Sequence, residues 1–412
     1  MGLEIEVDPG EAGFDAARLN RIDEHFAKYV EAGKLPGWLA LVSRHGKIAH
    51  LSTHGMRDIA SGAPVQTDTL FRIYSMTKPV TSVAIMMLHE EGAFELTDPV
   101  ADFIPSFADL RVYRGGTARA PQTRPAGEDM RIWHLLTHTS GLTYAFHYLN
   151  PVDELYRRAG FDFDMAADLD LAGCCDEWAS MPLLFDPGTA WNYSVATDVL
   201  GRIVEVASGQ TLDEFFRTRI FEPLGMTDTG FAVDRANADR LATLYTADPQ
   251  GKARPHPKHA ELHAAAFELP KALSGGGGLF SSAHDYHRFT QMLRREGELD
   301  GTRLLGSRTV RYMTRNHLPG GADLETLALG SFSEVANAGK GFGLGFAVID
   351  DPLAAKVISS RGEFSWGGLA STAFWVDPAE DLTVLFLTQL MPSSTHPIRP
   401  QLHQLVYQSL VD

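Results

Sequence analysis

The segment FRIYSMTKPVTSVAIMML, residues 71–88, places a serine and a lysine three positions apart at the start of an apolar run. The pattern predicts a helix from Ser75 to about Glu91. Residues at i and i+3 of a helix share a face, with about 5–6 Å between their Cβ atoms. At a helix N-terminus, unpaired N–H groups favour negative charge on a reacting oxygen. Two interpretations remain open: a nucleophilic Ser75 activated by Lys78, or an N-cap serine followed by a solvated lysine.

The composition of the 412-residue chain is that of an ordinary globular protein, with 44% hydrophobic and 21% charged residues. Its formal net charge of −16 argues against a nucleic-acid partner, because no basic surface is available to neutralise phosphates. The acidic start MGLEIEVDPGEAGFD lacks the basic and apolar regions of a secretory signal, and apolar runs such as VAIMML are too short to cross a membrane. We therefore expect no membrane partner and a cytoplasmic location. The sequence leaves the oligomeric state unknown.

The two cysteines, Cys174 and Cys175, are neighbours in the chain. Adjacent cysteines rarely form a disulfide because the ring between them is strained. We expect two buried free thiols, which is consistent with a reducing compartment.

Strand patterns occur near both ends of the chain, whereas helical patterns fill its middle. The N-terminal part predicts a helix over 14–33 and a β-hairpin that turns at residues 44–47. The C-terminal part predicts strands rich in β-branched and aromatic residues within 340–350, 362–378 and 381–391, before a final helix. Residues 105–128, rich in Pro, Gly, Arg and Thr, are expected to form a long surface loop.

This distribution predicts an α+β fold: a central antiparallel sheet built from both termini, flanked by helices, with an inserted, mostly helical domain. The expected division is 1–74 with 290–412 for the sheet domain and 75–289 for the helical one, with the active site at their junction.

Three further segments resemble parts of a catalytic site. In FDPGTAWNYSVATDVLG, residues 185–201, Tyr193 lies in a Pro/Gly loop just before a helix, although tyrosine at such a place more often only packs. In SWGGLAST, residues 365–372, two glycines interrupt a strand, which usually marks a bulge or a close backbone approach. The third segment, HLLTHTSGL, ends a helix at residues 139–141.

In chain order, the motif from Ser75 to Lys78, the segment HLLTHTSGL, the motif from Tyr193 to Val195 and the motif from Trp366 to Gly368 resemble the serine β-lactamase-like superfamily. Within it the chain is most similar to the family VIII carboxylesterases, near class C β-lactamases and penicillin-binding proteins. The resemblance implies a serine β-lactamase-like fold, with Ser75 as the nucleophile and Lys78 and Tyr193 sharing the role of general base. It also implies an oxyanion hole formed by the backbone N–H groups of Ser75 and Leu369.

Two positions depart from the pattern of β-lactam-processing relatives. Val195 stands where they usually carry Asn in the tyrosine motif, and Trp366 stands where they carry Lys in the last motif. The site therefore loses an amide and a cation that would bind a β-lactam, and the change suits an uncharged ester. Gly367 and Gly368 complete the expected substrate-binding strand.

Aromatic residues after the SGL turn, Tyr144 and Phe146, are expected to wall the substrate pocket, although a plain core role is equally open. No G-x-S-x-G nucleophile elbow occurs in the chain, which excludes the α/β-hydrolase route to an esterase.

Two histidine pairs at i, i+4 have a spacing that can hold zinc: His134 with His138, and His259 with His263. The first pair lacks the Glu of H-E-x-x-H, and neither has evident further ligands. We expect no metal and no cofactor. The glycine-rich segment SGGGGLF, residues 274–280, lacks the G-K-[ST] ending of a phosphate-binding loop, so we interpret it as structural.

The favoured function is that of a serine hydrolase, a carboxylesterase that acts on a small-molecule short-chain or aryl ester through an acyl-Ser75 intermediate. An acyltransferase on the same scaffold, a weak β-lactamase and a non-catalytic relative that serves as a binding protein remain alternatives.

Overall fold

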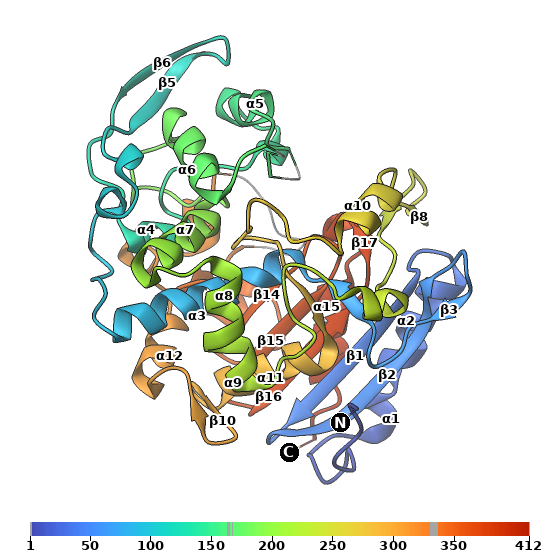
Figure 1. Ribbon diagram of the computed structural model, residues 1–412. Coiled ribbons are helices and arrows are strands. Elements are labelled where there is room, and N and C mark those ends of the chain that lie inside the picture. Colours follow the sequence, from blue (N-terminus) through green and yellow to red (C-terminus); the bar gives the residue numbers. More distant parts are fainter. Residues whose placement is uncertain (1, 163–164, 167, 330–336, 412) are drawn as a thin grey trace.

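The computed structural model describes residues 2–162, 165–166, 168–329 and 337–411. Its largest element is an eight-stranded sheet in the order β12-β13-β14-β15-β16-β1-β2-β3, whose neighbouring strands are all antiparallel (Figure 1). The strands are β1 (Gly37–Arg44), β2 (Lys47–Asp58), β3 (Ala63–Pro64), β12 (Lys340–Phe342), β13 (Ala347–Ile349), β14 (Phe364–Gly367), β15 (Ala373–Asp377) and β16 (Leu382–Leu387). The antiparallel sheet built from both termini is thus confirmed.

The N-terminal hairpin of β1 and β2 lies next to the C-terminal strands of this sheet. β1 and β2 meet at a turn in which His45 and Gly46 have positive φ values of 52° and 77°, as a tight hairpin turn requires. β1 also pairs with the C-terminal strand β16, with Leu39 opposite Leu387. Every residue of β1 is buried, as expected of a central strand covered on both faces.

Helices cover both faces of the sheet (Figure 1). The two terminal segments supply α1 (Ala16–Leu19), α2 (Arg21–Glu31) and α15 (Ile398–Tyr407), whose apolar side chains share one core cluster with β1 and β16. In that cluster the Phe26 and Phe386 rings lie 4.9 Å apart, and burial of each such ring contributes about 1.5–3 kcal/mol. Helix α11 (Ala283–Arg294) packs against β15 and β16 within a second cluster, where Tyr286 contacts Phe374.

The helical part of the molecule is organised around α3 (Thr77–Glu90), in which twelve of fourteen residues are buried. A helix that is apolar on every side belongs inside a core. It packs against α7 (Ala196–Ser208), which in turn contacts α4 (Ile132–Leu136), α6 (Leu171–Ser180) and α8 (Leu212–Phe216). Cys174 and Cys175 lie in this core as free, buried thiols.

The expectation of a long loop over 105–128 is wrong. The segment forms a β-hairpin of β5 (Arg111–Thr117) and β6 (Ala120–Pro125) that projects from the helical part (Figure 1). Its strands are mostly exposed and therefore lack the apolar alternation by which strands are recognised; Val112 is buried and bridges to Leu183.

The remaining strands and α-helices of the described chain are β4 (Leu70–Arg72), β7 (Tyr245–Ala247), β8 (Ala253–Pro255), β9 (Phe280–Ser282), β10 (Glu298–Leu299), β11 (Thr302–Arg303), β17 (Leu390–Met391), α5 (Pro151–Arg158), α9 (Glu222–Leu224), α10 (His259–Ala265), α12 (Ser307–Met313), α13 (Leu324–Leu327) and α14 (Pro352–Ala355). The α+β class is confirmed, and the division at residues 74/75 and 289/290 stays a prediction.

Candidate active site

Ser75 lies in a single 3₁₀ turn, Tyr74–Met76, immediately before α3. The helix therefore begins at Thr77, two residues later than expected, and its N-cap is Met76 rather than the serine. Tyr74 has a φ of 44°, a left-handed conformation that costs a non-glycine residue about 1–2 kcal/mol. Such strain is typical of functional turns, and here it precedes a serine that lines a cavity of about 860 Å³.

Lys78 is not solvated: its side chain is buried, with 1% of the residue exposed. Its Nζ donates hydrogen bonds to the Gly276 carbonyl oxygen at 2.6 Å and to the Tyr144 hydroxyl at 2.9 Å, and it lies 3.4 Å from Ser75 Oγ. The interpretation of Ser75 and Lys78 as an N-cap and a surface lysine is therefore wrong. An amine held beside a serine hydroxyl and shielded from water is suited to accept its proton.

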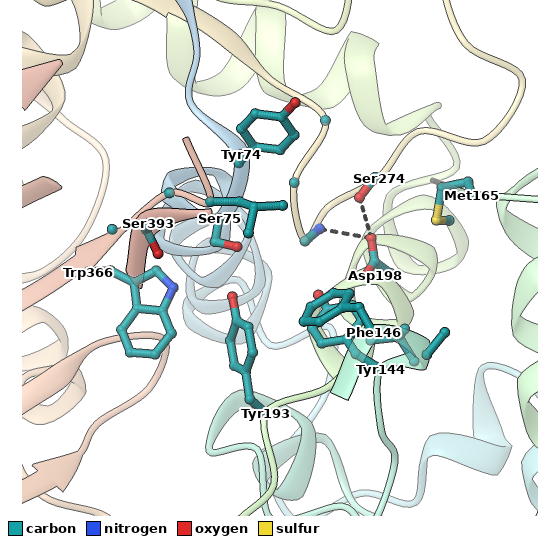
Figure 2. A pocket seen from close by; sticks show the side chains of 18 of the residues that line it. Tyr74, Ser75, Tyr144, Phe146, Met165, Tyr193, Asp198, Ser274, Trp366 and Ser393 are labelled. Carbon is teal, nitrogen blue, oxygen red and sulfur yellow. Dashed lines mark hydrogen bonds between the residues drawn. The ribbon is translucent and has the colours of Figure 1, made fainter. Parts of the chain in front are cut away.

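Tyr193 also faces Ser75, and its hydroxyl points toward the Ser75 side chain (Figure 2). Lys78 Nζ lies 4.6 Å from the centre of the Tyr193 ring, so this nitrogen faces the ring as well as the serine. His147 fixes the loop, with Nε2 2.7 Å from the Tyr193 carbonyl oxygen. Burial lowers the pKa of His147, which keeps the imidazole neutral and able to donate this bond.

Tyr144 and Phe146 line the cavity, and their rings stack 4.6 Å apart (Figure 2). Tyr144 does more than line the cavity, because its hydroxyl accepts a hydrogen bond from Lys78. Burial raises the pKa of Tyr144 well above its usual value, and the nearby Asp198 carboxylate acts in the same direction. The phenol is therefore neutral at any physiological pH.

Sequence reasoning missed two residues of the site, Asp198 and Gly276. Asp198 on α7 is buried, and its Oδ1 accepts hydrogen bonds from Ser274 Oγ at 2.6 Å and from the Gly276 N–H at 2.9 Å (Figure 2). These bonds orient the glycine-rich segment so that the Gly276 carbonyl meets Lys78. A Cβ at Gly276 would lie 2.4 Å from Asp198 Oδ2, so only glycine fits. Burial raises the pKa of Asp198, while the charge of Lys78 opposes the shift.

The glycines at the end of β14 bring its backbone against the serine turn. A Cβ at Gly368 would lie 2.4 Å from the carbonyl oxygen of Ile73, two residues before Ser75. Ser75 and Leu369 line the same cavity. In the part of the chain that the structure describes, neither the Ser75 N–H nor the Leu369 N–H donates to another protein group. Both are thus available to a carbonyl oxygen of a bound substrate.

Apolar side chains border this reacting region. The Trp366 ring lies beside Ser75 in Figure 2 and 5.4 Å from the Tyr193 ring. Val195, buried at the start of α7, also lines the cavity. Neither side chain carries a charge that would attract the carboxylate of a β-lactam.

The histidines of the two pairs contact other groups of the protein. His134 Nδ1 accepts from the Arg131 N–H at 3.1 Å, and His138 Nδ1 lies 3.2 Å from Ser194 Oγ. His259 and His263 lie on α10, where His263 contacts Phe267. Across the described ranges, no group of three or more His, Cys, Asp or Glu is arranged to hold a metal ion. No helix within those ranges is long and apolar enough to cross a membrane.

Comparison with known proteins gives consistent matches over almost the whole chain. A family model described as Beta-lactamase matches residues 22–408. Esterase EstB of Burkholderia gladioli is 35% identical over 401 residues, which cover 93% of each chain. A solved structure, EstCE1, described as a hydrolase with promiscuous acyltransferase activity, is 27% identical, with a TM-score of 0.77 over 95% of this chain and 98% of that one. The LovD6 mutant of simvastatin synthase from Aspergillus terreus is 25% identical, with a TM-score of 0.79 over 95% of each chain.

Proposed function

Because the chain belongs to the serine β-lactamase-like family, we propose that it is a carboxylesterase that cleaves short-chain or aryl esters through an acyl-Ser75 intermediate. The observation that carries this proposal is the buried contact between Lys78 Nζ and Ser75 Oγ at the cavity wall. A cavity of about 860 Å³ is within the usual range for small-molecule sites. The 35% identity to Esterase EstB supports the same reaction class.

In acylation the Lys78 amine acts as the general base. Two N–H bonds then point to the Gly276 carbonyl and the Tyr144 hydroxyl, and the lone pair faces Ser75 Oγ. As the Ser75 oxygen bonds to the ester carbonyl carbon, its proton passes to Lys78. The carbonyl oxygen becomes an oxyanion, which the N–H groups of Ser75 and Leu369 stabilise; removal of one such donor typically costs about 3–4 kcal/mol.

The tetrahedral intermediate collapses when the bond to the leaving oxygen breaks. The Tyr193 hydroxyl, which points toward Ser75, donates its proton to the leaving alkoxide and regains one from Lys78. A water molecule then takes the place of the alcohol. The same groups remove its proton, and the attack on the acyl carbon releases the acid and restores Ser75.

The apolar walls favour uncharged substrates. The Trp366 side chain supplies no cation to a substrate carboxylate, and Val195 offers no amide to a β-lactam side chain. Each missing charge-assisted hydrogen bond weakens binding by about 1.5–3 kcal/mol. We therefore expect slow turnover of β-lactams and fast turnover of neutral esters.

Acyl transfer is the second candidate, and a specific likeness favours it: EstCE1 is described as a hydrolase with promiscuous acyltransferase activity. The acyl-enzyme is common to both reactions, and only the acceptor differs. A cavity of this volume has room for an alcohol beside the acyl group.

The proposal is tested by a series of p-nitrophenyl esters from acetate to palmitate, measured beside nitrocefin and in the presence of a competing alcohol. We expect ester turnover well above nitrocefin turnover. Release of p-nitrophenol with free acid as the main product supports the esterase, and a new ester as the main product supports the transferase. Turnover of nitrocefin as fast as that of p-nitrophenyl butyrate contradicts the esterase proposal.

A further inference from the structure

Arg399, the second residue of α15, reaches back to the loop that follows β14. Its Nη2 donates to the carbonyl oxygen of Gly368 at 2.9 Å and to that of Thr372 at 3.2 Å. These two carbonyls lie at the two ends of the short loop that carries Leu369. The loop is closed by its own backbone, because the Gly368 N–H donates to the Thr372 carbonyl at 2.9 Å and the Ser371 N–H donates to the Gly368 carbonyl at 3.2 Å. Arg399 adds a further bond to each of these carbonyls from the side of the C-terminal helix.

The first of these contacts acts on the peptide group that matters for catalysis. The Gly368 C=O and the Leu369 N–H belong to one peptide unit, which is planar, and in a trans unit the two bonds point in opposite directions. A guanidinium that fixes the carbonyl on one side thereby fixes the direction of the N–H on the other. We propose that Arg399 is a positioning residue that aims the Leu369 N–H at the substrate carbonyl, a role that rests on the oxyanion hole of the proposed function.

Gly367 provides the space that this contact requires. A Cβ at Gly367 would lie 2.4 Å from both Cζ and Nη2 of Arg399, so the guanidinium rests directly on the glycine backbone. Any larger residue at 367 would displace the guanidinium. The two-glycine motif thus has two separate tasks: Gly368 admits the turn before Ser75, and Gly367 admits Arg399.

Helix α15 is a rigid base for the arginine, because buried hydrogen bonds attach it to the sheet. His403 Nε2 lies 2.7 Å from Glu363 Oε2, and the Tyr407 hydroxyl donates to Asp377 Oδ2 at 2.6 Å. Glu363 directly precedes β14, the strand that ends at the loop. These bonds fix the positions of α15, β14 and the loop relative to one another.

The loop has a second tether that does not involve Arg399. Ser371 Oγ donates to the Leu390 carbonyl at 2.7 Å, and the Leu390 N–H donates to the Ala370 carbonyl at 3.2 Å. Loss of the guanidinium should therefore leave the loop folded but less exactly aimed. This separation makes the role testable without unfolding the protein.

The test compares wild type with Arg399→Met, Arg399→Lys and Gly367→Ala, with the exposed Arg361→Met as the matched control. We expect Arg399→Met to lower kcat for p-nitrophenyl butyrate by about 10- to 100-fold with KM within threefold, because a misaimed donor loses less than the 10²- to 10³-fold of a deleted one. Arg399→Lys should recover part of the loss, since an ammonium can still reach a carbonyl. Gly367→Ala should reproduce the loss, and Arg361→Met should have no effect.

A thionoester separates aiming from general damage. Sulfur is a weak hydrogen-bond acceptor, so an aimed N–H favours the oxoester over the thionoester. We expect the oxo-to-thiono ratio of kcat/KM for the p-nitrophenyl butyrates to fall at least fivefold in Arg399→Met, with the thermal midpoint within 2 °C of wild type. If Arg399 had only a structural role, its loss would lower kcat/KM for the oxoester and the thionoester by the same factor, and the ratio would not change.

Two outcomes overturn the proposal separately from the function on which it rests. If wild type hydrolyses the ester while Arg399→Met keeps its kcat or its oxo-to-thiono ratio, the positioning role is wrong and the esterase stands. If the loss lies in KM alone, Arg399 binds substrate directly and the proposal is also wrong. If wild type neither hydrolyses the ester nor reacts with a fluorophosphonate at Ser75, the proposed function fails and the positioning role fails with it.

Discussion

Replacing Tyr144 by Phe removes one oxygen from the site and leaves the ring that stacks on Phe146. The lost hydroxyl is one of three oxygens around Lys78 Nζ, at 2.9 Å, and it is the one supplied by a side chain other than the nucleophile. Once the amine has accepted the Ser75 proton it is an ammonium, and a hydrogen bond to a charged group is worth about 1.5–3 kcal/mol. If the full bond serves to hold the amine during proton transfer, kcat for p-nitrophenyl butyrate should fall by about 10- to 150-fold with KM little changed.

Two comparisons make this result specific to the hydroxyl. Phe146→Leu disturbs the stacked pair without touching Lys78, and it should cost less than fivefold in kcat. In a Lys78→Ala background, Tyr144→Phe should cause no further loss, because the group that it orients is already absent. The reasoning is refuted by a Tyr144→Phe enzyme within threefold of wild type, or by the same fold loss with and without Lys78.

Three further predictions follow from the same geometry. Lys78→Ala and Tyr193→Phe should each lower kcat at least about a hundredfold. The fold loss in the double variant should be much smaller than the product of the two single fold losses, because both residues act on one proton. A double variant whose fold loss equals that product contradicts shared proton transfer. Burial lowers the pKa of His134 from 6.5 to about 4. As the pH falls from 6.5 to about 4, the unfolded chain takes up a proton at this histidine and the folded chain does not. The free energy of unfolding should therefore fall by about 3 kcal/mol over this range. Denaturant unfolding of His134→Asn should show a shallower fall, and an equal slope contradicts the assignment. Trp366→Lys should raise kcat/KM for nitrocefin relative to p-nitrophenyl butyrate, and an unchanged or lower ratio means that the missing cation does not limit β-lactam turnover.

The sequence could predict those parts of the fold and site that local patterns encode. The hairpin over 37–58 follows from two strand-forming runs and from the His-Gly turn between them, and the neighbourhood of Ser75 and Lys78 follows from helical spacing. Gly367 and Gly368 were recognisable as a close backbone approach because glycine inside a strand is costly without one.

The remaining parts depend on contacts between distant segments. Lys78 meets the carbonyl of Gly276, 198 positions away, and a backbone oxygen has no signature in the residue it belongs to. Asp198 and Arg399 act on backbone groups in the same way, so their types alone give no indication of a role in the site. The β5–β6 hairpin was missed because exposed strands do not need apolar alternation.

The central claim is that Ser75 carries the acyl group, and mass spectrometry of the protein after reaction with a fluorophosphonate tests it most directly. Wild type should gain one adduct, located on the peptide that contains Ser75, and its rate of ester hydrolysis should fall in proportion to the fraction of protein that carries the adduct. Ser75→Ala should gain none and should have no measurable esterase activity while keeping the thermal midpoint of wild type, because a small partly exposed side chain is changed. An adduct on another residue, or a folded Ser75→Ala enzyme with activity within tenfold of wild type, would contradict the acyl-Ser75 mechanism.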